Sequence, residues 1–228
     1  MPVFSPLLFS ALAALLALGA PHPYVRGIDP LGTRQPRLTL GVEPLILDVA
    51  GDGIELSSAA AGVSFDIDGD GKPEQLGWTK RGSDDAFLWI DRTAEGRVKS
   101  GLQLLGGLFD RKRAFETLLA IDRSPGLLDR RLASEAERES DGRLATGDPA
   151  FDRLLLWTDL NHNGMSEPVE LATLASAGAE LFLGYELVNQ GDGAGNMVVA
   201  VGQARVMNDR GVSVRTQART VRLARAGQ

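Results

Sequence analysis

The sequence predicts an α+β domain made of short strands and hairpins together with helix–loop–helix units. Two patterns of apolar residues lead to this fold class. Val63 and Phe65 precede an acidic turn and Trp78 follows it, in alternation with polar residues, as expected for two paired strands. Farther along, Phe151 and Leu154 repeat at helical spacing. Strands are therefore expected in the first part of the domain and helices in the second.

The first 41 residues are expected to lie outside this domain. Residues 4–20 form an uncharged apolar run with a small-x-small pattern at its end, which is typical of a signal peptide over 1–19. An uncleaved membrane anchor is the alternative. Prolines and glycines interrupt residues 20–41 and favour a linker. The folded module is then expected over 42–228, with helices to about 178 and strands over about 179–223.

The composition restricts the chemistry that is available to the chain. Asp and Glu number 30 against 24 Lys and Arg, so the formal net charge is −6, whereas nucleic-acid-binding domains are usually basic. We therefore expect no nucleic acid among the partners. The chain has no cysteine and two histidines, His22 and His162, which excludes a thiolate site or a histidine-rich metal site. Oxygen would have to hold any bound metal, which favours a hard cation such as Ca²⁺.

The segment Asp159–Glu170, the strong loop, has the spacing of an EF-hand calcium loop at every constrained position. Five side chains, and the backbone carbonyl at the seventh place, are the candidate ligands: Asp159, Asn161, Asn163, Met165, Glu167 and Glu170. Helical spacing before the loop and Pro168 after it predict an EF-hand-like helix–loop–helix unit at about 130–178. A polar turn between two helices is the alternative.

A second acidic loop joins the two predicted strands and has the first half of the same motif. Its candidate ligands are Asp66, Asp68, Asp70, Lys72 through its carbonyl oxygen, and Glu74. Gly77 at the twelfth place supplies no closing carboxylate. A solvated hairpin tip is the alternative, but three carboxylates this close repel each other unless a cation neutralises them. We therefore expect calcium at this loop as well.

A third loop precedes the strong one and would pair with it. Its candidate ligands are Glu137, Glu139, Asp141, Arg143 through its carbonyl oxygen, and Asp148. Glutamate at the first place is longer than the usual aspartate, and the ninth place is Ala145. A degenerate, empty partner loop is the alternative.

Two further loops have lost ligands and are interpreted first as structural turns and only second as calcium sites. The loop from Asp48 has Ala50 at its third place, and the loop from Asp91 has Lys99 at its ninth place, where an ammonium opposes a dication. The dipeptide Asp84–Asp85 precedes an apolar run. Its carboxylates are expected either to complete a neighbouring site or to cap a turn.

Arginines spaced along the predicted C-terminal strands offset the acidic loops. They are Arg205, Arg210, Arg215, Arg219, Arg222 and Arg225. A solvated sheet face is the favoured interpretation, because arginine spread along strands is ordinary. The alternative is a patch for an unidentified protein or an anionic surface.

Several segments follow one another in the order of a known module: PLILDVAGDGIE, VSFDIDGDGKPEQLGW, DDAFLWIDR and DPAFDRLLLWTDLNHNGMSEPVEL. Over roughly residues 43–214 the chain resembles the calcium-binding, self-processing module of RTX-type, iron-regulated secreted proteins. The resemblance implies a module that folds on binding calcium and then cleaves an Asp–Pro bond at its leading edge. In that family the aspartate attacks its own carbonyl, and a lysine can capture the resulting anhydride as a cross-link.

This chain carries Glu43–Pro44 at the position of the cleaved bond. The longer side chain would have to close a six-membered ring, which loses the orientation that intramolecular attack needs. We therefore expect an exported module that binds calcium ions, couples binding to folding, and has no catalytic activity. A calcium-dependent self-cleaving or cross-linking module is the alternative.

Overall fold

The computed structural model describes residues 42–91, 94–107, 113–127, 141–208 and 210–227. The predicted signal peptide, the predicted linker, and Glu137 and Glu139 of the third loop lie outside the described residues. The described residues belong to one compact unit that starts at Leu40.

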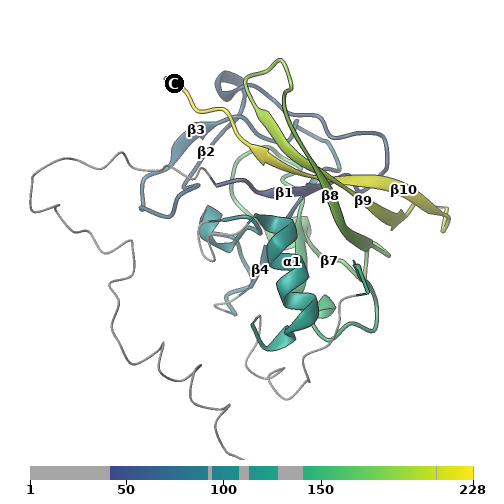
Figure 1. Ribbon diagram of the computed structural model, residues 1–228. Coiled ribbons are helices and arrows are strands. Elements are labelled where there is room, and N and C mark those ends of the chain that lie inside the picture. The colour runs from purple at the N-terminus through teal and green to yellow at the C-terminus, as the bar shows by residue number, and fades with distance from the viewer. Residues whose placement is uncertain (1–41, 92–93, 108–112, 128–140, 209, 228) are drawn as a thin grey trace, which may run out of the picture. The chain divides into compact units, whose positions relative to one another are not determined.

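An antiparallel sheet of eight strands forms the main part of this unit (Figure 1). In order across the sheet the strands are β5 (Arg143–Leu144), β8 (Glu180–Gly191), β9 (Met197–Met207), β10 (Ser213–Arg222), β1 (Leu45–Leu47), β4 (Ala86–Ile90), β6 (Leu154–Trp157) and β7 (Leu171–Thr173). The first strand, β1, lies between the last strand, β10, and β4. The two ends of the module therefore meet in the middle of the sheet.

A separate hairpin pairs β2 (Val63–Phe65) with β3 (Glu74–Leu76), in the register Val63↔Leu76 and Phe65↔Glu74. The alternation of apolar and polar residues predicts these strands, because Val63 and Phe65 are buried and Ser64 between them is exposed. The second acidic loop, residues 66–73, connects the two strands and is named the hairpin loop.

Helices are few in the part of the chain that the structure describes. The one α-helix there is α1 (Ala114–Arg123), and it is accompanied by single 3₁₀ turns. These are η1 (Ala59–Ala61), η2 (Gly101–Gln103), η3 (Pro125–Leu127), η5 (Phe151–Arg153) and η6 (Pro168–Glu170). No helix among these residues has the length and apolar character needed to cross a membrane.

The predicted α+β fold with EF-hand-like helix–loop–helix units is wrong, since the described chain is mostly β. The apolar run that we interpreted as a helix before Asp159 is one 3₁₀ turn followed by β6, which pairs with β4 and β7. The predicted helix after the loop is the turn η6 followed by β7. A four-residue run that is apolar throughout fits a strand covered on both faces as well as a helix.

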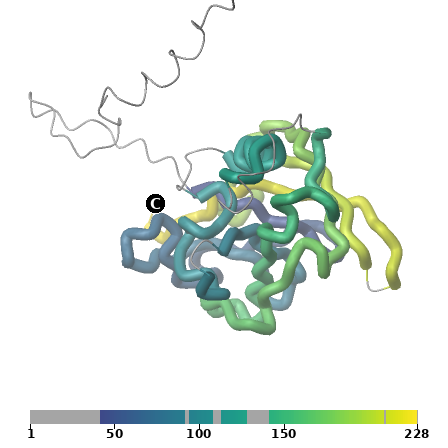
Figure 2. The backbone as a smooth tube through the Cα atoms, turned by 90° about the horizontal axis from the view of Figure 1, so that it is seen from below, coloured from purple at the N-terminus to yellow at the C-terminus, as the bar shows by residue number. Residues whose placement is uncertain are grey.

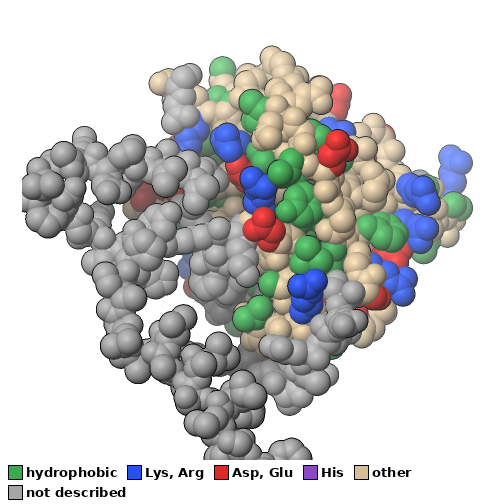
Figure 3. All heavy atoms as spheres, viewed as in Figure 1, with side chains coloured by type: hydrophobic (Ala, Val, Ile, Leu, Met, Phe, Trp, Pro, Cys, Tyr) green, Lys and Arg blue, Asp and Glu red, His purple; other side chains and the backbone are tan. Residues whose placement is uncertain are grey.

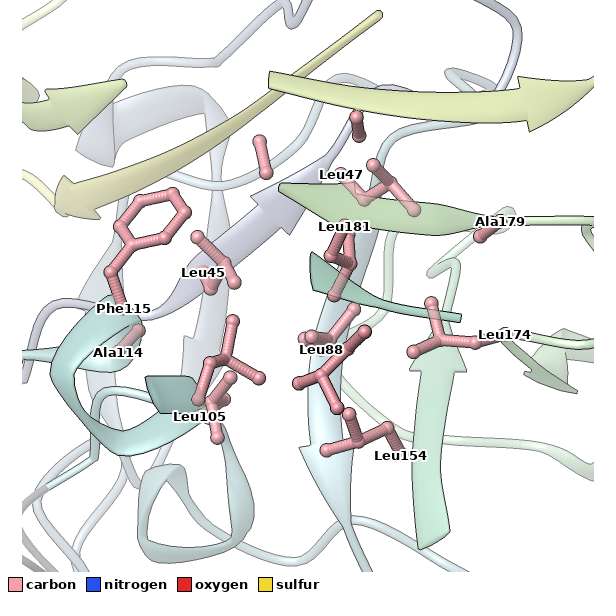
Figure 4. Packing of buried hydrophobic residues seen from close by; sticks show 14 of the residues in the cluster. Leu45, Leu47, Leu88, Leu105, Ala114, Phe115, Leu154, Leu174, Ala179 and Leu181 are labelled. Atoms are coloured by element: carbon pink, nitrogen blue, oxygen red, sulfur yellow. The ribbon is translucent and has the colours of Figure 1, made fainter. Parts of the chain in front are cut away.

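Two apolar cores lie on opposite faces of the central strands. Alternate residues separate them: Leu45 and Leu47 of β1 belong to one cluster and Ile46 to the other. Helix α1 covers the first face, where Figure 4 shows Phe115 and Ala114 beside Leu45. Figure 2 shows α1 and the green segment that contains the strong loop on opposite sides of the molecule.

Four aromatic rings fasten the β2–β3 hairpin to the second face. Phe65 and Trp78 lie with ring centroids 5.1 Å apart, and each packs on Trp157 at 5.6 Å. Trp78 also lies 4.4 Å from Phe87. Trp157 is the last residue of β6, and Phe65 is the last residue of β2. The aromatic cluster therefore holds in place the start of the strong loop and the start of the loop between β2 and β3.

A substitution at Gly202 of β9 tests the packing on the first face, which helix α1 covers. A Cβ at this position would lie 2.5 Å from two ring carbons of Phe115, which is 1% exposed, so the ring would have to shift within the core. We expect Gly202→Ala to lower the free energy of unfolding by roughly 1–3 kcal/mol, the usual cost of overpacking. Urea unfolding followed by circular dichroism measures it.

The matched control is Gly184→Ala in the neighbouring strand, where an added Cβ meets nothing within 4 Å. This variant should unfold like the parent protein or slightly later. Equal losses in the two variants would contradict the packing described for Phe115.

Candidate metal sites

Four acidic loops share one turn, and each follows the end of a strand. In each loop an aspartate carboxylate accepts hydrogen bonds from the backbone N–H groups four and five residues later. The aspartates are Asp48 after β1, Asp66 after β2, Asp91 after β4 and Asp159 after β6. The fifth following residue is always a glycine with φ between 64° and 108°, a conformation that favours glycine.

The hairpin loop collects three acidic groups. Carboxylate oxygens of Asp66, Asp68 and Glu74 lie within 4.8 Å of one another. Asp70 and Lys72, which the sequence assigned to the same site, behave differently. The Asp70 carboxylate accepts the N–H of Lys72 at 2.8 Å and is not part of this cluster. The structure therefore brings together three of the four predicted carboxylates.

Arg225 stands beside this cluster, which the sequence did not predict. Its guanidinium lies 3.4 Å from Glu74 and 3.8 Å from Asp68. A β-bridge to Leu76 and a hydrogen bond from Ala226 to Gln75 at 3.0 Å place it there. Only the abundance of arginine near the carboxyl end hinted at such a contact. Part of the negative charge of the cluster is thus balanced from within the protein.

The strong loop has buried carboxyl groups at both ends. Asp159 is 1% exposed and Glu170 is 4% exposed. Glu170 accepts the indole N–H of Trp157 at 3.4 Å and the backbone N–H groups of Asn161 at 3.4 Å and Glu167 at 3.2 Å. Neither end forms an ion pair with a described Lys or Arg. Indole and backbone N–H groups therefore stabilise the buried carboxyl group of Glu170.

The middle of the strong loop is hydrogen-bonded within itself. Asn163 accepts the N–H of Met165 at 2.7 Å and donates its amide to Glu167 at 2.8 Å. Burial and a hydrogen bond to Glu167 raise the pKa of Glu170, and that same hydrogen bond lowers the pKa of Glu167. Asp159 and these glutamates do not form a three-carboxylate cluster like that of the hairpin loop.

Contacts with two other loops fix the strong loop in place. His162, at φ 61°, brings its Nε2 to 2.8 Å from the Ala61 carbonyl. The Ser166 hydroxyl accepts the N–H of Val98 at 2.8 Å and donates to its carbonyl at 3.2 Å. Neither residue is a candidate ligand, and spacing within the loop gave no sign of these long-range partners.

The described part of the third loop is paired internally. Arg143 donates its backbone N–H and its Nε to the two carboxylate oxygens of Asp141, at 3.0 and 3.1 Å. The Arg143 guanidinium also contacts Glu180 at 3.0 Å, and Asp148 accepts the N–H of Ala145 at 2.7 Å. Asp141 and Asp148 are in neither of the three-carboxylate clusters found among the described residues.

The two loops interpreted as structural turns differ from each other. In the loop from Asp91, Lys99 and Arg97 pair with Glu95, and the bond from Lys99 lowers the pKa of Glu95. Basic side chains of the protein thus supply the positive charge in that loop. The loop from Asp48 contributes two members of the second cluster, in which carboxylate oxygens of Asp48, Asp52 and the more distant Asp84 lie within 4.8 Å of one another.

Most of the C-terminal arginines have partners within the module. The pairs are Arg205 with Glu180, Arg219 with Gln217, Arg222 with Glu43, and Arg225 with the hairpin loop. Figure 3 shows basic side chains at the end of the molecule where β9 and β10 project. Binding of an unidentified protein or an anionic surface to these arginines stays a prediction.

The Glu43–Pro44 segment is held at both of its residues. The Glu43 N–H donates to Gly106 at 3.1 Å, and the Pro44 carbonyl accepts the N–H of Val221 at 3.0 Å. The Glu43 carboxylate pairs with Arg222 at the end of β10.

Comparison with known proteins places these features in a family. The sequence profile of the SPM domain matches residues 45–217, which include both three-carboxylate clusters. The chain is similar to the iron-regulated protein FrpA of Neisseria meningitidis serogroup C, with 34% identity over 163 residues. That match covers 70% of this chain and 14% of FrpA. The chain therefore spans a small part of the length of this relative.

Proposed function

The chain belongs to the SPM domain family, and from this membership and its acidic loops we propose that it is an exported module that binds calcium. The loops are connections between strands rather than EF-hand units. Calcium would stabilise the fold by neutralising carboxylates that the strands bring together. Export is inferred from the apolar run over residues 4–20.

One observation carries the proposal: Asp66 and Asp68 of the hairpin loop and Glu74 at the start of β3 converge within 4.8 Å. Their donors are all oxygen, which suits hard cations. Calcium accepts six to eight oxygens in flexible geometry, whereas magnesium demands a nearly ideal octahedron. An irregular hairpin loop therefore fits calcium better. The ion would supply positive charge and no redox or acid–base chemistry.

The strong loop supports the same function through burial. Asp159 and Glu170 are almost completely buried, and a buried carboxylate without a cation is costly. Asn161, Asn163 and the Met165 carbonyl would complete the ligand set that the sequence predicts, with Glu167 at the ninth place.

Binding of this kind would couple the module's stability to its surroundings. A ligand that binds only the folded state stabilises it by about 2.7 kcal/mol at a concentration of 100 times Kd. Extracellular calcium modules have dissociation constants of about 10⁻⁴ to 10⁻³ M. Such sites would fill after export and stay largely empty in a calcium-poor cytoplasm.

Asp68→Asn tests the hairpin site. The Asp68 side chain has one weak internal hydrogen bond, to the N–H of Asp70 at 3.3 Å, which an amide oxygen can keep. We expect the variant to fold but to bind calcium at this loop at least about tenfold more weakly, a loss of about 1.4 kcal/mol. Isothermal titration calorimetry measures the change.

Asp152→Asn is the control, because Asp152 is exposed on η5 and belongs to neither cluster. It removes the same charge and should leave the isotherm unchanged. Parallel isotherms for the two variants would rule out the hairpin loop as a calcium site.

We further propose that the Glu43–Pro44 bond is not cleaved efficiently, in contrast to the self-cleaving alternative. Attack by Glu43 on its own carbonyl would form a six-membered ring. The ion pair with Arg222 also holds the carboxylate in another interaction. Both features favour a binding module over a catalytic one.

Glu43→Asp is the matched test of this idea. After incubation with calcium, the parent chain should keep its intact mass, whereas Glu43→Asp should release a fragment that begins at Pro44, because the shorter side chain closes a five-membered ring. Intact-protein mass spectrometry follows both. A Pro44 terminus formed by the parent chain at the rate of the variant would refute the proposal.

A further inference from the structure

We propose that Arg225 sets the affinity of the hairpin loop for calcium, because its guanidinium is a built-in counter-ion that an incoming cation has to displace. The choice of calcium as the displacing ion rests on the proposed function. When no metal is bound, the same guanidinium balances part of the negative charge of the loop.

Backbone hydrogen bonds place Arg225 beside the β2–β3 hairpin. Arg225 forms a β-bridge with Leu76 of β3. Two backbone hydrogen bonds flank the bridge, one between residues 77 and 224 at 2.8 Å and one between residues 226 and 75 at 3.0 Å. Figure 1 shows the carboxyl end of the chain beside this hairpin. Because these bonds use backbone groups only, they hold the residue there whatever its guanidinium contacts.

The register of this pairing directs the Arg225 side chain to the acidic cluster. Residues two apart in a strand share a face, and so do residues directly opposite each other in an antiparallel pair. Arg225 lies opposite Leu76 and is therefore a diagonal neighbour of Glu74 on the same face. Its guanidinium lies 3.4 Å from Glu74 and 3.8 Å from Asp68. One arginine thus contacts two of the three clustered carboxylates.

These contacts involve oxygens that a bound cation needs. Oε1 of Glu74 contacts the guanidinium, and Oε2 accepts the N–H of Ile67 at 3.1 Å. The guanidinium also contacts Oδ2 of Asp68. A cation held by the three carboxylates takes an oxygen from each, so calcium competes with Arg225 for the same groups. Two positive charges at this range also repel each other. Both effects weaken the binding of calcium.

Partial burial strengthens the influence of Arg225. Its side chain is 26% exposed, and those of Glu74 and Asp68 are 23% and 33% exposed. Arg222, which pairs with Glu43, is 53% exposed. Because water and salt screen a partly buried charge less than an exposed one, Arg225 acts on its carboxylates more strongly than an arginine on the open face of the sheet.

Arg225→Gln removes the charge and tests the proposal in the full chain. We expect this variant to bind calcium at the hairpin loop about tenfold more tightly than the parent protein, because neither competition nor repulsion remains. Isothermal titration calorimetry measures the affinity. Unchanged or weaker binding would overturn the proposal, since an arginine that merely supports the loop would lower the affinity when it is removed.

Arg210→Gln is the matched control. Arg210 is exposed at the turn between β9 and β10 and forms no ion pair with an acidic side chain among the described residues. The substitution removes the same charge from the protein and should leave the isotherm unchanged. Equal tightening in the two arginine variants would assign the effect to net charge and contradict a specific role for Arg225.

Asp68→Asn locates the effect and separates it from the proposed function. Combined with Asp68→Asn, Arg225→Gln should no longer tighten binding, and tightening that persists overturns the proposal. If Asp68→Asn alone weakens binding while Arg225→Gln binds as the parent does, the role of Arg225 fails and the calcium function stands. If Asp68→Asn binds as the parent does, both fail.

Circular dichroism verifies that each variant is folded. If Arg225→Gln does not fold, Arg225→Met, which is also neutral and keeps an unbranched stem, takes its place and should show the same tightening. If neither neutral variant folds, Arg225 is a structural residue and the proposal is overturned.

Discussion

The carboxylate that accepts two backbone N–H groups at the end of a strand is the interaction on which the rest of this structure depends. It occurs at Asp48, Asp66, Asp91 and Asp159, each time with a glycine at positive φ. The turn satisfies N–H groups that a strand end would otherwise leave unpaired. It also places an acidic group where the chain reverses, so that acidic residues from neighbouring segments can meet there.

Charge balance explains why the four loops differ. Basic side chains fill the loop from Asp91, and Arg225 approaches the hairpin loop. The buried ends of the strong loop and the Asp48 carboxylate rely on N–H groups instead. A dication would therefore act most strongly where the protein itself has supplied the fewest positive charges.

The sequence was informative where a residue pattern is local. Spacing of aspartate and glycine identified the loops, and alternation identified the β2–β3 hairpin. It was misleading at Leu154–Trp157, because a short strand buried on both faces has no alternation to distinguish it from a helix. It suggested that Asp84 could complete a neighbouring site without saying which one, and it was silent on Arg225 beside Glu74, because these contacts join segments that are distant in sequence. The pairing of β1 with β10 and β4 creates such contacts, and no local pattern encodes it.

The central claim is that clustered carboxylates bind calcium and that binding stabilises the fold. Urea unfolding of the whole chain, followed by the fluorescence of the buried tryptophans in Ca²⁺ at 100 times Kd and in Mg²⁺ at the same concentration, tests it most directly. The account predicts a free energy of unfolding that is higher in Ca²⁺ by about 2.7 kcal/mol or more when the sites are saturated at 100 times Kd. Identical unfolding curves in the two ions would contradict it.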